Sequence, residues 1–141
     1  MAPSKRFKPV LRVAESRERT AARQLGDSQR NMREQEARLE ELRRYHQEYL
    51  ERFDVAARSG MSAAQLREYQ AFIAKLELAI REQEAIVQAS DTDCCAKQAE
   101  WQQKRVRSQV LDKVVQRCES EERRTRESRE QKETDERNQR R

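Results

Sequence analysis

Apolar residues recur along the chain in alternating steps of three and four, the spacing that places them on one seam of a coiled-coil helix. The first series consists of Phe7, Leu11, Ala14, Glu18, Ala21, Leu25, Ser28, Met32, Gln35, Leu39, Leu42, His46, Tyr49, Phe53 and Ala56. The second consists of Leu66, Tyr69, Ile73, Leu76, Ile80, Gln83, Val87, Ser90, Cys94, Lys97, Trp101, Lys104, Ser108, Leu111, Val115 and Cys118. This heptad period predicts two long helices, over residues 7–57 and 62–118, with a left-handed supercoil.

A short turn over residues 58–61 separates the two series. Gly60 suits the left-handed backbone conformation that ends many helices. Ser62 followed by Gln65 has the spacing of a capping box, which begins a helix. Because the connection is so short, the two helices should be antiparallel neighbours. The sequence therefore predicts an all-α fold, an antiparallel left-handed coiled-coil hairpin.

Folding the seams about this turn predicts which residues face each other. Residues whose numbers add up to about 122 should share a layer. The layers then pair Phe53 with Tyr69, Leu39 with Gln83, Ala21 with Trp101, and Glu18 with Lys104. The smallest side chain faces the largest and the seam glutamate faces a lysine, as a packed hairpin requires. At about 1.5 Å per residue, each arm would be roughly 75–85 Å long.

The composition agrees with a helical hairpin and leaves its last part without a partner. Charged residues make up 40% of the 141 residues and apolar residues 35%, which is too polar for a globular core. Residues 1–6 form a basic N-terminal segment, and residues 119–141 contain no aliphatic or aromatic side chain. We expect this charged extension to be helical or disordered. The whole chain, 1–141, is predicted to be a single coiled-coil domain.

Several classes of function do not fit the sequence. Three cysteines and one histidine, without metal-like spacing, do not supply a zinc site. Catalytic triads and glycine-rich phosphate loops have no counterpart in the chain, so we expect no enzyme activity, no cofactor and no metal. Residues 1–12 lack the apolar segment of a signal peptide, and no apolar run reaches the roughly 20 residues that span a bilayer. These features predict a cytoplasmic protein.

One flank of the hairpin carries large apolar residues beside the seam. In an antiparallel pair the g positions of both helices lie on the same side, and here they hold Tyr45, Phe72, Ala79 and Ile86. They lie next to the seam residues Tyr49 and Leu76. This flank either widens the core stripe or forms an exposed surface that binds another protein.

Two segments of the chain resemble the flagellar FliJ family. The first is the stretch FKPVLRVAE from Phe7, followed by AARQLG from Ala21. The second is YQAFIAKLELAI from Tyr69, directly after the turn. The resemblance covers nearly the whole chain, and the second segment is its most specific part.

The resemblance implies a protein partner at each end of the hairpin. FliJ proteins belong to the type III export apparatus, are similar to the gamma stalk of rotary ATPases, and couple ATPase activity to export. Their partners are the FliI ATPase hexamer, the cytoplasmic domain of the export gate FlhA, the FliH protein and export chaperones. Membership would place the chain in the cytoplasm, peripherally associated with the inner membrane. The gate-binding surface implied here is Leu42, Tyr45, Tyr49, Phe72, Leu76 and Ala79.

The other end combines the basic N-terminal segment with the charged extension. We predict that this end binds the ATPase ring by electrostatic attraction, through Lys5, Arg6, Lys8, Arg123, Arg124 and Arg126. An equivalent stalk protein of a virulence injectisome and an unrelated coiled-coil scaffold are the alternative functions. A nucleic-acid binder would be expected to carry a longer basic stripe, so we expect no nucleic acid to bind.

Overall fold

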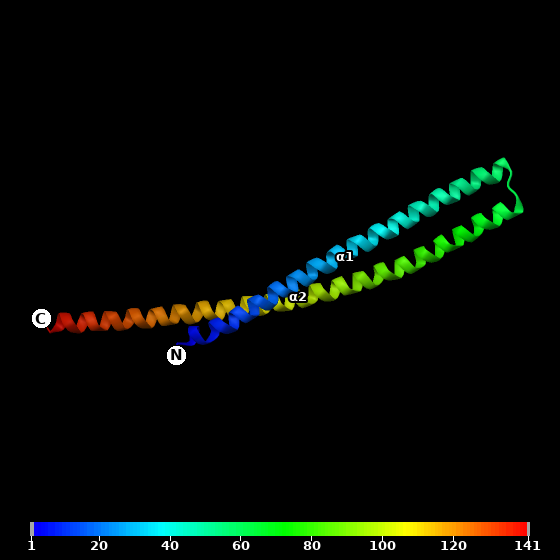
Figure 1. Ribbon diagram of the computed structural model, residues 1–141. Helices are drawn as coiled ribbons and strands as arrows, with labels where there is room; N and C mark the ends of the chain where they lie inside the picture. The colour runs from blue at the N-terminus through cyan, green and yellow to red at the C-terminus, as the bar shows by residue number, and fades with distance from the viewer. Residues whose placement is uncertain (1, 141) are drawn as a thin grey trace. The chain divides into compact units, whose positions relative to one another are not determined.

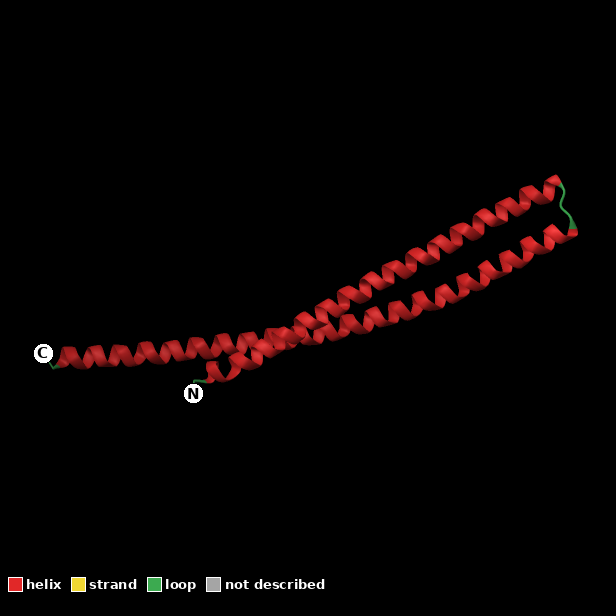
Figure 2. Ribbon diagram, in the orientation of Figure 1, coloured by secondary structure: helices red, strands yellow, loops and turns green. Residues whose placement is uncertain are grey.

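Two long helices joined by a short turn make up the described part of the chain, residues 2–140 of a computed structural model (Figure 1). Helix α1 spans Pro3–Ser59 and helix α2 spans Ala63–Gln139. No strand interrupts them within the described residues (Figure 2). The predicted all-α helical hairpin is confirmed. Helix α1 begins at Pro3, ahead of the expected residue 7, and α2 continues as a helix through most of the charged extension.

The turn has the backbone chemistry that the sequence predicts. Gly60 has a φ of 93°, the left-handed conformation in which a side chain would be strained. The backbone N–H of Ser62 donates to Oε1 of Gln65 at 3.1 Å, and the backbone N–H of Gln65 donates to Oγ of Ser62 at 3.2 Å. This reciprocal pair is a capping box, and it satisfies donors that the first turn of α2 leaves free.

Contacts between the helices group the chain into two units. Unit 1 comprises Met1–Arg23 and Ala99–Arg141, and unit 2 comprises Gln24–Gln98. Each unit contains a segment of α1 packed on a segment of α2. The single domain expected from the sequence stays a prediction, and the units are described separately below.

The buried residues of both units lie on the predicted seams. Within residues 2–140 they are Ser4, Ala14, Ala21, Ser28, Leu39, Leu76, Gln83, Ser90, Ser108 and Val115. All but Ser4 belong to the two heptad series, and Ser4 extends the first series by one step before Phe7. The seam is therefore the core of each unit. It is narrow and half polar, since five of these ten residues are serine or glutamine.

Unit 2 has close to the predicted register. The rings of Phe53 and Tyr69 are 5.7 Å apart, as their shared layer requires. Gln83 donates from Nε2 to the backbone oxygen of Gln35 at 3.0 Å and to its Oε1 at 2.9 Å. Gln83 therefore bonds to the seam residue next to Leu39, its predicted partner.

In unit 1 the hydrogen bonds across the seam lie one helical turn from the predicted layers, an offset of the same size as that of Gln83 and Gln35 in unit 2. Ser108 Oγ donates to Oε2 of Glu18 at 2.5 Å, so Glu18 bonds to the seam residue next to Lys104, its predicted partner. The same rule would place Ser4 opposite Cys118, yet Ser4 bonds to Glu122, again four residues further along α2. The start of α1 therefore packs beyond Cys118, where the sequence predicted α2 to be unpaired.

Hydrogen bonds offset the cost of placing polar groups in the seam. Ser28 Oγ donates to the backbone oxygen of Leu25 at 2.9 Å, and Asn31 Nδ2 donates to Oγ of Ser90 at 3.3 Å. In the part of the chain that the structure describes, no buried side-chain nitrogen or oxygen lacks a partner. The polar groups of the seam are therefore hydrogen-bonded and cost little to bury. They bury little apolar surface, however, so the seam gains little hydrophobic stabilisation from them.

Candidate protein-binding surfaces

The six residues of the expected gate-binding set all lie in unit 2, on facing segments of α1 and α2. We call them the aromatic surface: Leu42, Tyr45, Tyr49, Phe72, Leu76 and Ala79. Their heptad positions explain the arrangement, because seam position d alternates with the flanking g position on one side of each helix. Leu76 is buried in the seam, Leu42 is a half-buried seam residue, and the half-buried Ala79 lies beside the seam.

Three of the six side chains form a cluster of rings across the two helices. Tyr49 and Phe72 have centroids 4.3 Å apart with their planes tilted by 35°. Tyr45 lies 5.6 Å from Tyr49 and 6.2 Å from Phe72, the latter in an edge-on arrangement. These separations are those of favourable aromatic pairs. The cluster is thus preorganised, with its rings held by each other before any partner arrives.

The cluster is only partly covered by the hairpin itself. Tyr45 leaves 43% of its surface exposed, and Tyr49 and Phe72 are half-buried. A two-helix seam has no third element to cover the g positions, so rings placed there stay accessible. Large, rigid, partly exposed rings are the residues that most often anchor protein–protein interfaces.

The expected ATPase-binding residues all lie in unit 1 and all are exposed. A groove of about 1100 Å³ between the start of α1 and α2 brings four of them together, namely Lys5, Lys8, Arg123 and Arg126. Arg6 and Arg124 do not line it. Arg129 and three carboxylates, those of Glu119, Glu121 and Glu122, also line this basic groove.

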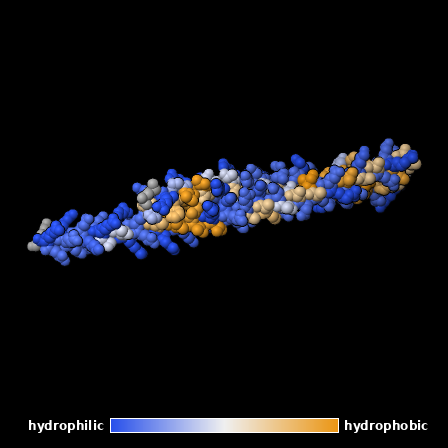
Figure 3. Space-filling view, turned by 90° about the horizontal axis from the view of Figure 1, so that it is seen from below, coloured by the Kyte–Doolittle hydropathy of each residue, from blue (hydrophilic) through white to orange (hydrophobic). Residues whose placement is uncertain are grey.

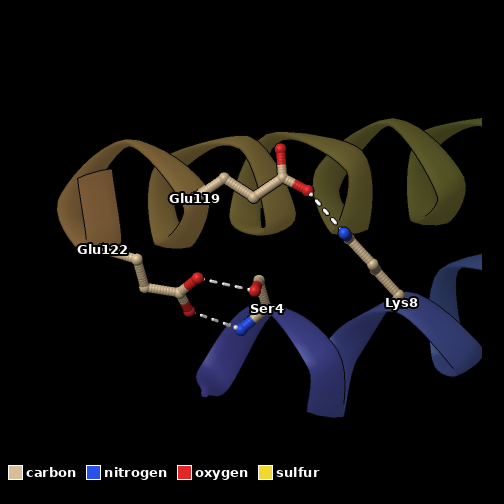
Figure 4. Close-up of polar contacts among 4 residues, drawn as sticks. All are labelled: Ser4, Lys8, Glu119 and Glu122. Atoms are coloured by element: carbon tan, nitrogen blue, oxygen red, sulfur yellow. Dashed lines mark hydrogen bonds and ion pairs between the residues drawn. The ribbon is translucent and has the colours of Figure 1, made fainter. Parts of the chain in front are cut away.

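Two of these carboxylates hold the start of α1 (Figure 4). Glu122 accepts the backbone N–H of Ser4 at 3.0 Å through Oε1 and its hydroxyl at 2.7 Å through Oε2. Lys8 Nζ lies 3.1 Å from Oε1 of Glu119. The hydrogen bond from the Ser4 backbone, followed by that from its hydroxyl, lowers the pKa of Glu122 below the ordinary value of 4.5. Glu122 therefore acts as an N-terminal cap for α1 that is supplied by the other helix.

The described part of the chain has neither a cluster of metal-ligating side chains nor a membrane-spanning helix. No three histidine, cysteine, aspartate or glutamate side chains gather there in a way that could hold a metal ion. Neither helix contains a stretch that is long and apolar enough to cross a bilayer. Cys94, Cys95 and Cys118 are free thiols.

Comparison with known proteins identifies the family. The family model described as flagellar FliJ protein matches residues 3–141. The chain belongs to the FliJ family. It is accordingly a component of flagellar protein export, and its partners belong to the export machinery. No curated protein and no solved structure was found to match it.

For this FliJ-family chain, sequence reasoning missed two contributors to the surfaces. Tyr69 extends the ring cluster, because it lies 5.9 Å from Tyr49 as well as beside Phe53. Its seam position, one layer from Tyr49, was a usable signal. Arg129 extends the basic groove three residues beyond Arg126, a spacing that places both on the same face of a helix.

Proposed function

We propose that this chain binds the cytoplasmic domain of the FlhA-type export gate through the aromatic surface and the FliI-type ATPase ring through unit 1. In this way it couples ATPase activity to flagellar protein export, next to the inner membrane. It also handles export chaperones, and FliH is a further partner. The flagellar family match favours this system over the virulence injectisome. The observation that carries the proposal is the half-exposed ring cluster of Tyr45, Tyr49 and Phe72.

The ring cluster supports gate binding for an energetic reason. Its members are already ordered by mutual contact, so a partner that covers them pays little side-chain entropy. Covering the exposed part of Tyr45 would remove apolar area from water that the hairpin alone leaves hydrated. The same residues are those that the family resemblance assigns to the gate.

Replacement of Tyr45 separates binding from folding. Tyr45→Ala removes an exposed ring and should weaken binding of the purified gate domain at least about tenfold, since an interface anchor contributes more than about 1.4 kcal/mol. Its effect on unfolding in urea should stay within about 1 kcal/mol, because the lost ring contacts lie at the surface. Leu78→Ala, a change at an exposed apolar residue on the outer face of α2, is the matched control. Equal loss of binding in both variants would disprove the assignment.

Unit 1 supports ring binding through its charge. Exposed arginines at Arg123 and Arg126 face the basic groove together with Lys5. Clustered cations attract an acidic rim and raise the association rate, an effect that falls with ionic strength. The start of α1 and the extension meet in this groove, so both contribute to one surface.

Neutralising the extension tests this assignment without cutting the chain. The triple change of Arg123, Arg124 and Arg126 to alanine should abolish stimulation of the ATPase while helicity stays the same. Replacing Arg137 and Arg140 by alanine, further along the same exposed part of the chain, should have a smaller effect. Removal of all residues from 119 onwards is the weaker design, because it also removes Glu119 and Glu122, which hold α1. Full stimulation by the triple variant would contradict the proposed ring contact.

A further inference from the structure

Unit 1 carries a group of exposed valines that neither proposed surface uses. Val10 is 41% exposed, Val13 51%, Val106 58% and Val110 54%. Val114 continues the series as a half-buried residue. Isolated exposed apolar residues are ordinary on a protein surface, whereas several together indicate a binding surface.

Four of the five valines lie on one flank of unit 1, and Val106 lies on the adjoining outer face of α2. On α1, Val10 occupies position g and Val13 position c of the seam heptad. On α2, Val106, Val110 and Val114 occupy f, c and g and follow one another at intervals of four. Positions g and c lie on one side of a helix, and the g sides of antiparallel helices coincide. Figure 3 shows apolar surface near the beginning of the chain, between hydrophilic stretches, and further apolar surface toward the turn.

The surroundings of this valine patch are strongly basic. Residues 3–14 and 101–118 contain nine lysines and arginines and a single carboxylate, Asp112. Asp112 accepts a hydrogen bond from Gln116 at 3.0 Å, and by its e position it lies on the opposite flank. The cations on this flank and on the adjoining outer face are Arg6, Arg17, Arg107, Lys113 and Arg117. Within the described residues, none of these five pairs with a carboxylate.

We propose that the valine patch is a docking site for an acidic amphipathic helix of another protein. The apolar stripe from Val106 to Val114 is about 12 Å long at 1.5 Å per residue, which matches roughly two turns of a partner helix. Val10 and Val13 widen it from the neighbouring helix. The partner would present apolar residues at i, i+3 or i+4 and i+7, with glutamate or aspartate on both sides of that stripe to meet the rim of cations.

The positive charge around the valine patch makes a second copy of this chain an unfavourable partner. A symmetric dimer through this flank would bring the same cations of two molecules together, and like charges at close range oppose association. The charged extension of a second copy does not fit either, because residues 119–141 have no aliphatic side chain to cover valines. A partner rich in carboxylates satisfies both the apolar stripe and the rim.

This inference does not depend on the proposed gate and ring contacts. The patch residues belong to neither the aromatic surface nor the lining of the basic groove. Loss of one contact can therefore be distinguished from loss of the others by variants in separate residues.

The test uses the full-length protein and a labelled synthetic peptide helix of about four turns, with leucine at the stripe positions and glutamate on the flanks. Fluorescence anisotropy should show binding of this peptide and much weaker binding of an otherwise identical lysine-flanked peptide. The double variant V106S/V110S should bind the acidic peptide at least about tenfold more weakly. The matched control is Val55→Ser, at a valine of unit 2 that is 63% exposed, and it should leave binding unchanged.

Charge reversal supplies a readout that lost folding cannot imitate. Arg107→Glu should weaken the acidic peptide and strengthen the lysine-flanked one. Equal binding of both peptides, or equal loss in V106S/V110S and Val55→Ser, would overturn the proposal. So would valine-dependent binding to vesicles of phosphatidylserine and phosphatidylcholine with none to the peptide, which would indicate a membrane. Valine-dependent self-association in sedimentation would likewise overturn it in favour of a second copy.

Discussion

Gln83 is the clearest place to measure what a polar seam residue contributes. It is buried, and its side-chain nitrogen bonds to both the backbone and side-chain oxygens of Gln35. Gln83→Leu replaces the amide by a branched apolar group at the same seam position. The half-buried Gln35 can turn its side-chain oxygen to water, and its backbone oxygen lies inside helix α1. Neither oxygen is therefore left without a hydrogen-bond partner.

The expected magnitude follows from two opposing terms. Loss of two hydrogen bonds costs about 1–3 kcal/mol, at 0.5–1.5 kcal/mol each. Burial of a leucine side chain contributes about 1.5–3 kcal/mol. The hairpin with Gln83→Leu should therefore be as stable as the parent or more stable by about 1 kcal/mol. Gln83→Ala removes the hydrogen bonds without adding apolar contact and should destabilise it by about 2 kcal/mol.

Urea unfolding followed by circular dichroism measures both changes. The slope of the unfolding free energy against urea concentration should be the same in parent and variants, which confirms that unfolding exposes the same surface. The reasoning fails if Gln83→Leu destabilises the protein as much as Gln83→Ala does. That outcome would mean that the Gln83–Gln35 bonds fix the register of unit 2, so that their loss admits other pairings of the two helices.

Three further predictions concern the turn and unit 1. Glu122→Gln should lower the protection factor for hydrogen exchange at the amide of Ser4. In the parent, this protection factor should be high above the ordinary carboxyl pKa of 4.5 and should fall as the pH drops through the lowered pKa of Glu122. A protection factor that does not change with pH in the parent would contradict the cap. Ser108→Ala should destabilise the protein by about 1–2 kcal/mol, because Glu18 loses its seam partner, whereas an unchanged urea midpoint would show that water replaces it. Gly60→Ala should cost about 1 kcal/mol in the same measurement through backbone strain alone, since nothing lies within 4 Å of the added carbon, and no change would disprove the left-handed turn.

The helices, the turn and the identity of the core residues were predictable from the sequence because each rests on local chemistry. The heptad period fixes which side of each helix is buried, and Ser62 with Gln65 fixes where α2 begins. The ring cluster was predictable for the same reason, since a g position beside an aromatic seam brings Tyr45 and Phe72 together.

The hydrogen bonds across the seam of unit 1 were not predictable from the period. The period places each seam residue near two neighbouring seam residues of the other helix, three or four residues apart, so a long polar side chain can bond to either of them. The bonds of Ser108 to Glu18 and of Ser4 to Glu122 are specific choices of this kind. Helix α1 also begins at Pro3, ahead of the expected residue 7, and this is why the basic groove includes residues of the extension.

The thin seam and the exposed apolar flanks have one physical origin. Two helices can cover only their a and d positions, so a large residue at g, c or f stays in contact with water unless another protein covers it. Exposure alone therefore carries no function, and single residues such as Val55 or Leu78 illustrate this. The aromatic surface differs from them because its rings contact one another across both helices, and the valine patch differs because it gathers several apolar residues in one unit. A partner that covers either one adds the apolar burial that a half-polar seam lacks, so binding there should also stabilise the hairpin by mass action.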